Sequence, residues 1–210
     1  MTKTRRPSPA RPADTSLRII GGNLRGSRIE YQGDPRTRPM KERIREATFN
    51  LVGPSIKGTY AIDLFAGTGA LALEAISRGA VGATAIEQHF PTARLIEQNA
   101  VRLKVAQQIT VVPGDTFVWI RQLREQLLEG ELALTAMPGP WTVFCSPPYR
   151  FYNERREDML ALVQQFCDDA PPDSTVVVEA ECEWNFDQLP LPEQWDVRAY
   201  RPAMLAILRI

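Results

Sequence analysis

Between residues 60 and 179 the sequence alternates strand-type and helix-type segments, and this alternation is the strongest constraint on its fold. The strand-type segments are short and apolar, and each of the longer segments between them carries apolar residues at helical spacing. The expected strands span residues 60–64, 83–87, 109–112, 142–145 and 175–179, and the expected helices span 69–78, 91–104, 115–128 and 154–167. Such alternation predicts an α/β fold with a doubly wound, mostly parallel sheet and ligand sites at the carboxyl ends of its strands.

Two strand-type runs near the C-terminus depart from this alternation. Residues 195–200 and 203–210 are separated only by Arg201 and Pro202, which is too short a connection for a parallel crossover. We therefore expect them to form an antiparallel hairpin. The Pro- and Gly-bearing stretch over residues 129–140 is predicted only as a loop.

The N-terminal quarter has a different pattern. Residues 17–20 and 27–31 are typical of two short strands around a glycine-rich turn, and a helix fits residues 40–52, with Pro39 suited to its first turn. Residues 1–16 hold too few large apolar side chains to offset the entropy of ordering them. The predicted organisation is a disordered basic tail over 1–16, a small hairpin and Arg-rich helix over 17–52, and a larger α/β domain over 53–210.

Charge is unevenly distributed along a chain whose formal net charge is zero. The first 50 residues carry 12 Lys and Arg against 5 Asp and Glu, a net charge of +7, and the remainder carries −7. A basic quarter joined to an acidic body favours a polyanion-binding appendage on a catalytic domain. The alternative is a basic tail that is merely solvated.

Composition excludes several classes of function. No apolar run approaches the roughly 20 residues that span a membrane, and no secretory signal follows the first arginines. Cys145, Cys167 and Cys182 lie far apart without CxxC spacing, and His89 is the only histidine, so neither a metal site nor a Ser-His-Asp triad is indicated. We expect a cytoplasmic monomer that binds no metal and no membrane.

The loop Asp63-Leu-Phe-Ala-Gly-Thr-Gly69 follows the first strand of the alternation. Its glycines also satisfy the loose dinucleotide pattern GxGxxG/A, so an NAD site has to be considered. Asp63 decides against that site, because a carboxylate at the strand end would repel a pyrophosphate but suits the ammonium group of an amino acid. S-adenosylmethionine carries such an ammonium group, and the loop therefore predicts a site for this methyl donor.

Two more carboxylates follow strands. Glu87 can accept hydrogen bonds from both hydroxyls of a ribose, and Asp115, its side chain or its neighbours, is expected to contact an adenine, with Phe117 as a candidate neighbour. The alternatives are a surface carboxylate for Glu87 and a helix N-cap for Asp115. The predicted cofactor-binding residues are Asp63, Phe65, Ala66, Gly67, Thr68, Gly69, Glu87, Gln88, Asp115 and Thr116.

A corner made of Ser146, Pro147, Pro148 and Tyr149 follows the fourth strand. Neither proline has an N–H donor, so oxygen acceptors dominate the corner and can anchor both N–H groups of an exocyclic amine. Tyr149 can stack on a base that carries this amine. Because methyl transfer from a sulfonium needs little acid–base chemistry, positioning of the amine can supply most of the rate. The alternative is a rigid turn with a packing tyrosine.

Taken together, these motifs resemble the RsmD-type 16S rRNA guanine-N2 methyltransferases of bacteria from about residue 17 to the C-terminus. The motifs that carry the resemblance are Arg18-Ile-Ile-Gly-Gly, Arg25-Gly26, Thr37-Arg38-Pro39, Arg43-Ile-Arg45-Glu46, Phe49-Asn50, the loop from Asp63 to Gly69, and Pro147-Pro148-Tyr149. One residue departs from the family pattern, which has Asp or Asn where this chain has Ser146. A serine hydroxyl carries no charge and would hold an amine less firmly.

The resemblance implies a Rossmann-like class I methyltransferase fold and methylation of the 2-amino group of one guanine in 16S rRNA, within an immature small ribosomal subunit. Ser146, Pro147, Pro148 and Tyr149 would then be catalytic. The residues expected to contact RNA phosphates are Arg25, Arg28, Arg38, Arg43 and Arg45. Two alternatives stay open: N6 methylation of adenine in a nucleic acid, and an RNA-binding assembly factor that keeps the cofactor site but is catalytically weak.

Overall fold

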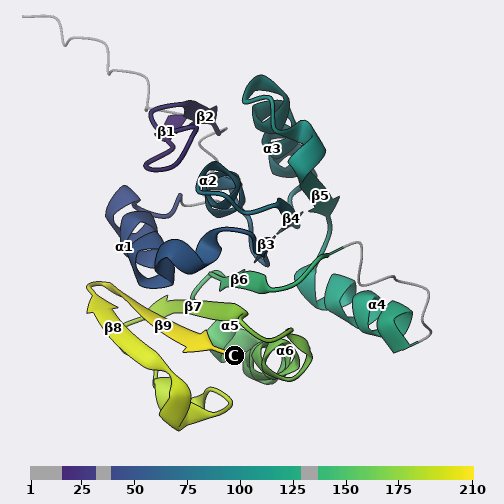
Figure 1. Cartoon of the computed structure of the whole chain (residues 1–210). Helices are drawn as coiled ribbons and strands as arrows, with labels where there is room; N and C mark the ends of the chain where they lie inside the picture. The colour runs from purple at the N-terminus through teal and green to yellow at the C-terminus, as the bar shows by residue number, and fades with distance from the viewer. Residues whose placement is uncertain (1–15, 32–38, 129–136) are drawn as a thin grey trace, which may run out of the picture.

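A seven-stranded sheet in the order β5-β4-β3-β6-β7-β9-β8 runs through the centre of the computed structural model, which describes residues 16–31, 39–128 and 137–210 (Figure 1). Its strands are β3 Tyr60–Asp63, β4 Gly82–Glu87, β5 Ile109–Pro113, β6 Trp141–Cys145, β7 Thr175–Glu181, β8 Asp196–Tyr200 and β9 Ala203–Arg209. The strands from β5 to β7 in this order are parallel, and β9 is antiparallel to both β7 and β8. The predicted doubly wound sheet with an antiparallel C-terminal hairpin is confirmed.

Helices cover both faces of this sheet (Figure 1). The α-helices are α1 Glu42–Val52, α2 Ala70–Ser77, α3 Phe90–Arg102, α4 Thr116–Leu128, α5 Phe151–Glu154 and α6 Arg156–Asp169, and short 3₁₀ turns are η1 Gly53–Ile56, η2 Ala106–Gln108, η4 Phe186–Gln188 and η5 Pro192–Gln194. The single helix expected over residues 154–167 is divided, because Arg155 leaves helical geometry between α5 and α6. None of the described helices has the length and apolar character needed to span a membrane.

The strand residues alternate between two apolar clusters, one on each face. Ile62 and Val143 pack in the cluster that includes α4 and α6, whereas Ala61 and Phe144 pack in the cluster that includes α2 and α3. Both faces of the central strands are therefore buried, as expected for a parallel sheet between two helical layers.

The N-terminal hairpin consists of β1 Ser16–Arg18 and β2 Arg28–Glu30, which pair antiparallel. Ile19 and Ile29 are each only 1% exposed and lie in the same cluster as the apolar side chains of α2 and α3. The predicted tail lies outside the described residues except for Ser16, which begins β1. The predicted boundary at residue 53 stays a prediction, although the hairpin shares its core with the sheet.

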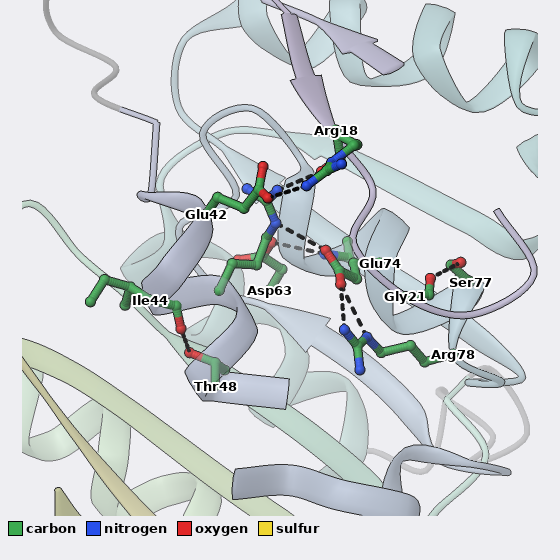
Figure 2. A network of polar contacts seen from close by, with 11 residues as sticks. Arg18, Gly21, Glu42, Ile44, Thr48, Asp63, Glu74, Ser77 and Arg78 are labelled. Atoms are coloured by element: carbon green, nitrogen blue, oxygen red, sulfur yellow. Dashed lines mark hydrogen bonds and ion pairs between the residues drawn. The ribbon is translucent and has the colours of Figure 1, made fainter. Parts of the chain in front are cut away.

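Glycine is required where the hairpin turn meets the end of α2. Gly22 has φ +76°, and a Cβ on it would lie 1.8 Å from the carbonyl oxygen of Ser77. The backbone N–H of Asn23 donates to that oxygen at 2.7 Å. The Ser77 hydroxyl donates to the carbonyl of Gly21 at 2.6 Å, as Figure 2 shows. The turn is thus held on α2 by backbone groups that a larger residue at position 22 would displace.

Candidate active site

Polar residues gather where four neighbouring parallel strands end. Asp63 ends β3, Glu87 ends β4, Ser146 follows β6, and Glu179 lies near the end of β7. These strands are adjacent in the sheet in the order β4-β3-β6-β7, and their carboxyl ends share one edge. This is the edge at which doubly wound sheets bind their ligands.

Asp63 is fully buried, with one carboxylate oxygen left unused. Its Oδ2 accepts a hydrogen bond from the backbone N–H of Ala72 at 3.3 Å, but Oδ1 has no partner among the residues that the structure describes. Burial raises the pKa of Asp63 to about 7, against backbone hydrogen bonds that lower it. An unpartnered carboxylate oxygen in the interior fits a cationic ligand group, because such a group would offset the cost of burying the charge.

The glycine loop is tied to β4 by its backbone. Gly67 and Gly69 have positive φ values of 52° and 75°, and the N–H of Gly67 donates to Glu87 Oε2 at 2.7 Å. A Cβ on Gly69 would lie 2.7 Å from the Ile96 side chain. Within the loop Ala66 and Thr68 are buried, and the Ala66 N–H donates to the carbonyl of Ile86 at 2.8 Å.

Glu87 is half-buried and already accepts two backbone hydrogen bonds. Besides Gly67, the N–H of His89 donates to its Oε1 at 2.7 Å. Burial raises the pKa of Glu87 above its usual value, and the two backbone donors act in the opposite direction. Each carboxylate oxygen has a further lone pair, so the predicted contact with ribose hydroxyls stays open. The neighbouring Gln88 is exposed.

Asp115 has a structural task in this protein. Its Oδ1 accepts from the backbone N–H of Phe117 at 2.8 Å and caps α4, while Oδ2 forms an ion pair with Arg155 at 3.1 Å. This is the N-cap role that the sequence left open as the alternative. The predicted contact of Asp115 or its neighbours with adenine stays a prediction. Thr116 is buried and its hydroxyl donates to the carbonyl of Leu64.

An aromatic cluster that the sequence did not predict lies beside this cap. The ring centroid of Phe65 is 5.9 Å from that of Phe117 and 6.0 Å from that of Phe151. The guanidinium of Arg155 lies 3.7 Å from the centroid of Phe117. The cluster joins the cofactor loop to the segment that follows the Ser146 corner. Its signals in the sequence were Phe65 inside the cofactor loop and Phe151, two residues after the Ser146 corner.

The Ser146 corner is built around Glu179, the second feature that the sequence did not predict. Ser146 Oγ donates to Glu179 Oε2, and the Tyr149 hydroxyl donates to Glu179 Oε1 at 2.8 Å. Burial, and next the charge of Glu179, raise the pKa of Tyr149 far above its usual value. Within the corner Pro147 is buried and Pro148 is exposed. A carboxylate that ends an otherwise apolar strand beside the corner was the signal available in the sequence.

A small cavity of about 10 Å³ opens between this corner and α1. Ser146 and Glu179 line it on one side, and Met40 and Thr48 line it on the side of α1. The polar groups of the corner therefore face the layer that carries α1 and the N-terminal hairpin.

Arg45 was predicted to contact RNA, and the structure corrects this prediction. Its side chain is 1% exposed, and its Nε forms an ion pair with Glu74 Oε2 at 2.9 Å. Glu74 also pairs with Arg78 at 2.8 Å (Figure 2). Arg43 and Arg45 are two residues apart and hence about 200° apart around the helix, so Arg43 is exposed while Arg45 faces α2.

The other predicted RNA contacts differ in position. Arg25 lies in the hairpin turn and Arg28 in β2, and both are exposed. Arg43 is also exposed and donates to the backbone carbonyl of Arg201. Arg38 lies outside the described residues.

Comparison with known proteins gives consistent matches. The family model described as Conserved hypothetical protein 95 matches residues 17–207. The "Ribosomal RNA small subunit methyltransferase D" of Escherichia coli is 41% identical over 96 residues, which is 46% of this chain and 48% of that protein. The matched part thus spans about half the length of this relative. The protein of the same name from Haemophilus influenzae is 28% identical over 186 residues, 87% of this chain and 86% of that protein.

Solved structures share the fold. The Escherichia coli protein yhhF superposes with a TM-score of 0.69 at 27% identity, over 91% of this chain and 96% of that chain. An RNA methyltransferase from Salinibacter ruber, solved with S-adenosyl-L-homocysteine, has a TM-score of 0.53 at 14% identity, over 81% of this chain and 92% of that chain. The expected class I methyltransferase fold is confirmed, and so is the family resemblance drawn from the motifs.

Proposed function

Because the chain belongs to the family described as Conserved hypothetical protein 95, we propose that it methylates the 2-amino group of a guanine in 16S rRNA, with S-adenosylmethionine as the methyl donor. The observation that carries this proposal is the placement of two sites on adjacent strands. Asp63 ends β3 with an unpartnered carboxylate oxygen, and the Ser146 corner follows β6, the strand that pairs with β3. This arrangement supports a donor site and an acceptor site that lie side by side.

The residues present fit the donor. The buried Asp63 Oδ1 suits the ammonium group, the positive φ of Gly67 and Gly69 sets the turn of the loop beside it, and Glu87 retains acceptor capacity for ribose hydroxyls. When bound, S-adenosylmethionine supplies an electrophilic methyl group whose leaving group is a neutral thioether. The chain itself has to hold the acceptor amine in line with the methyl–sulfur bond and keep water from the site.

The acceptor is proposed from the corner, the basic quarter and the names of the relatives. Oxygen acceptors at Ser146 and Pro147 suit the two N–H groups of an exocyclic amine, and exposed Arg25, Arg28 and Arg43 suit a polyanion. Two relatives are named as methyltransferases of small-subunit ribosomal RNA. We place the protein in the cytoplasm, as a monomer that acts on an immature small subunit.

Label transfer tests this function. Wild-type protein and tritiated S-adenosylmethionine are incubated with small subunits from a strain that lacks the gene, and the labelled nucleotide is mapped by mass spectrometry. We expect label on the N2 amine of a single guanine in 16S rRNA. Label on adenine N6 would replace this function with the first alternative, and RNA binding without any transfer would favour the assembly factor.

A further inference from the structure

Glu179 is a buried carboxylate without a cationic partner. It is 8% exposed, and no Lys or Arg in the described part of the chain forms an ion pair with it. Glu74, the other buried glutamate among the described residues, is in contrast paired with both Arg45 and Arg78. Burial of a charge without a counter-charge is costly, so the position of Glu179 calls for a reason other than stability.

Both oxygens of Glu179 are used by hydroxyls of the acceptor corner. Ser146 Oγ donates to Oε2, and the Tyr149 hydroxyl donates to Oε1 at 2.8 Å. Sheet register explains the contact, since Cys145 pairs with Val178 and the next residues are Ser146 and Glu179. Tyr152 adds a hydrogen bond from its hydroxyl to the Glu179 backbone carbonyl at 2.6 Å, which fixes the strand at this point.

We propose that Glu179 is a positioning residue: it acts on the acceptor amine through Ser146 and supplies the negative charge that a serine lacks. This inference rests on the proposed methyl transfer. A hydroxyl has one hydrogen and two lone pairs. Because its hydrogen is directed to Glu179, the lone pairs of Ser146 Oγ remain for an N–H of the amine. The carboxylate polarises that hydroxyl and makes it a stronger acceptor.

The same hydrogen bonds give the proton a route. As the amine nitrogen bonds to the methyl carbon, the carbon–sulfur bond breaks, its electron pair stays on sulfur, and the nitrogen gains a positive charge. One N–H proton passes to Ser146 Oγ while the proton of Ser146 passes to Glu179. The products are a neutral methylated amine, a neutral thioether and a protonated Glu179, which later loses its proton to water.

The test compares Glu179→Gln with a matched control, Glu181→Gln, two residues further along β7. We expect E179Q to lower kcat for guanine methylation by about tenfold or more, because the variant loses a hydrogen bond to a charged group. Its affinity for S-adenosyl-L-homocysteine in calorimetry should stay unchanged, and its unfolding midpoint should not fall. E181Q should behave as wild type in all three measurements.

A double variant separates positioning from packing. Ser146→Asp places a carboxylate directly at the amine, but in the single variant it would face Glu179, and one of the two groups would take up a proton. In S146D/E179Q only one carboxylate remains, and we expect part of the lost kcat to return. A merely structural role of Glu179 would give no such rescue.

Three results would overturn the inference. An E179Q variant with kcat within about twofold of wild type would do so while leaving methyl transfer intact. An E179Q variant with a lower unfolding midpoint, or with a lower affinity for S-adenosyl-L-homocysteine, would show that Glu179 stabilises the folded structure and does not position the amine. Failure of the wild-type protein to label any guanine would remove the proposed function and this inference with it.

Discussion

Asp63 should make cofactor binding depend on pH near neutrality. Its pKa is raised to about 7 by burial, and a ligand ammonium group would favour the ionised form. Binding is then strongest above pH 7 and weakens as the carboxylate takes up a proton below it. We expect calorimetry to give an affinity for S-adenosyl-L-homocysteine about tenfold lower at pH 6 than at pH 8, since a group with a pKa of about 7 is roughly one-tenth ionised at pH 6 and roughly nine-tenths ionised at pH 8.

The control for this prediction is Asp63→Asn. Burial also raises the pKa of Glu87, whose charge acts on Asp63. Glu87 remains in the variant, so a pH dependence that persists in D63N would assign the effect to another group and contradict the role of Asp63. A wild-type affinity that is flat between pH 6 and 8 would contradict it as well.

At the scale of single residues, the sequence predicts where a polar group stands but not what it contacts. Asp63 and Glu87 were identified because each ends a strand of a parallel sheet, and the structure places both at the expected edge. Asp115 satisfies the same rule but caps α4 and pairs with Arg155. Glu179 also ends an apolar run, but its contact with Ser146 depends on the pairing of β6 with β7. No local sequence pattern predicts this strand order.

The ion pair between Arg45 and Glu74 should hold α1 on α2. The side chains are 1% and 0% exposed, and Arg45 also donates from Nη2 to the carbonyl of Arg18 in β1 at 2.6 Å. Removal of Arg45 leaves the buried Glu74 with Arg78 as its remaining partner, so the cost should lie near the lower end of the range for a broken buried pair, about 3 kcal/mol. We expect Arg45→Met to lower the free energy of unfolding by this amount in urea denaturation.

The matched control is Arg18→Met, which breaks the exposed pair with Glu42 (Figure 2). Those side chains are 59% and 48% exposed, and solvent screening makes the expected loss in R18M much smaller than in R45M. Equal losses in R45M and R18M would show that the buried pair does not join the two helices.

Elements were predicted better than the contacts between them. The alternation of strand and helix segments predicts a parallel sheet, and the two-residue connection near the C-terminus predicts an antiparallel hairpin. Both features can be recognised in short stretches of sequence. The inward rotation of Arg45 was missed, since a charged residue in a basic segment is typical of a surface. Its partner Glu74 lies on another helix, 29 residues along the chain.

On the scale of the whole molecule, the basic hairpin and α1 should guide RNA to the corner. They lie in the layer onto which the cavity lined by Ser146 and Glu179 opens. Each phosphate contact releases counterions, so log affinity should fall linearly with log salt concentration, and loss of one contact should reduce the slope by about one.

We expect the double variant Arg25→Ala/Arg43→Ala to reduce the slope by about two in filter binding of 16S rRNA. Arg124→Ala, exposed on α4 in the opposite layer, should leave it unchanged. If R124A lowers the slope by about one and the double variant leaves it unchanged, the RNA does not bind on the face of α1, and the basic quarter only adds charge to the molecule.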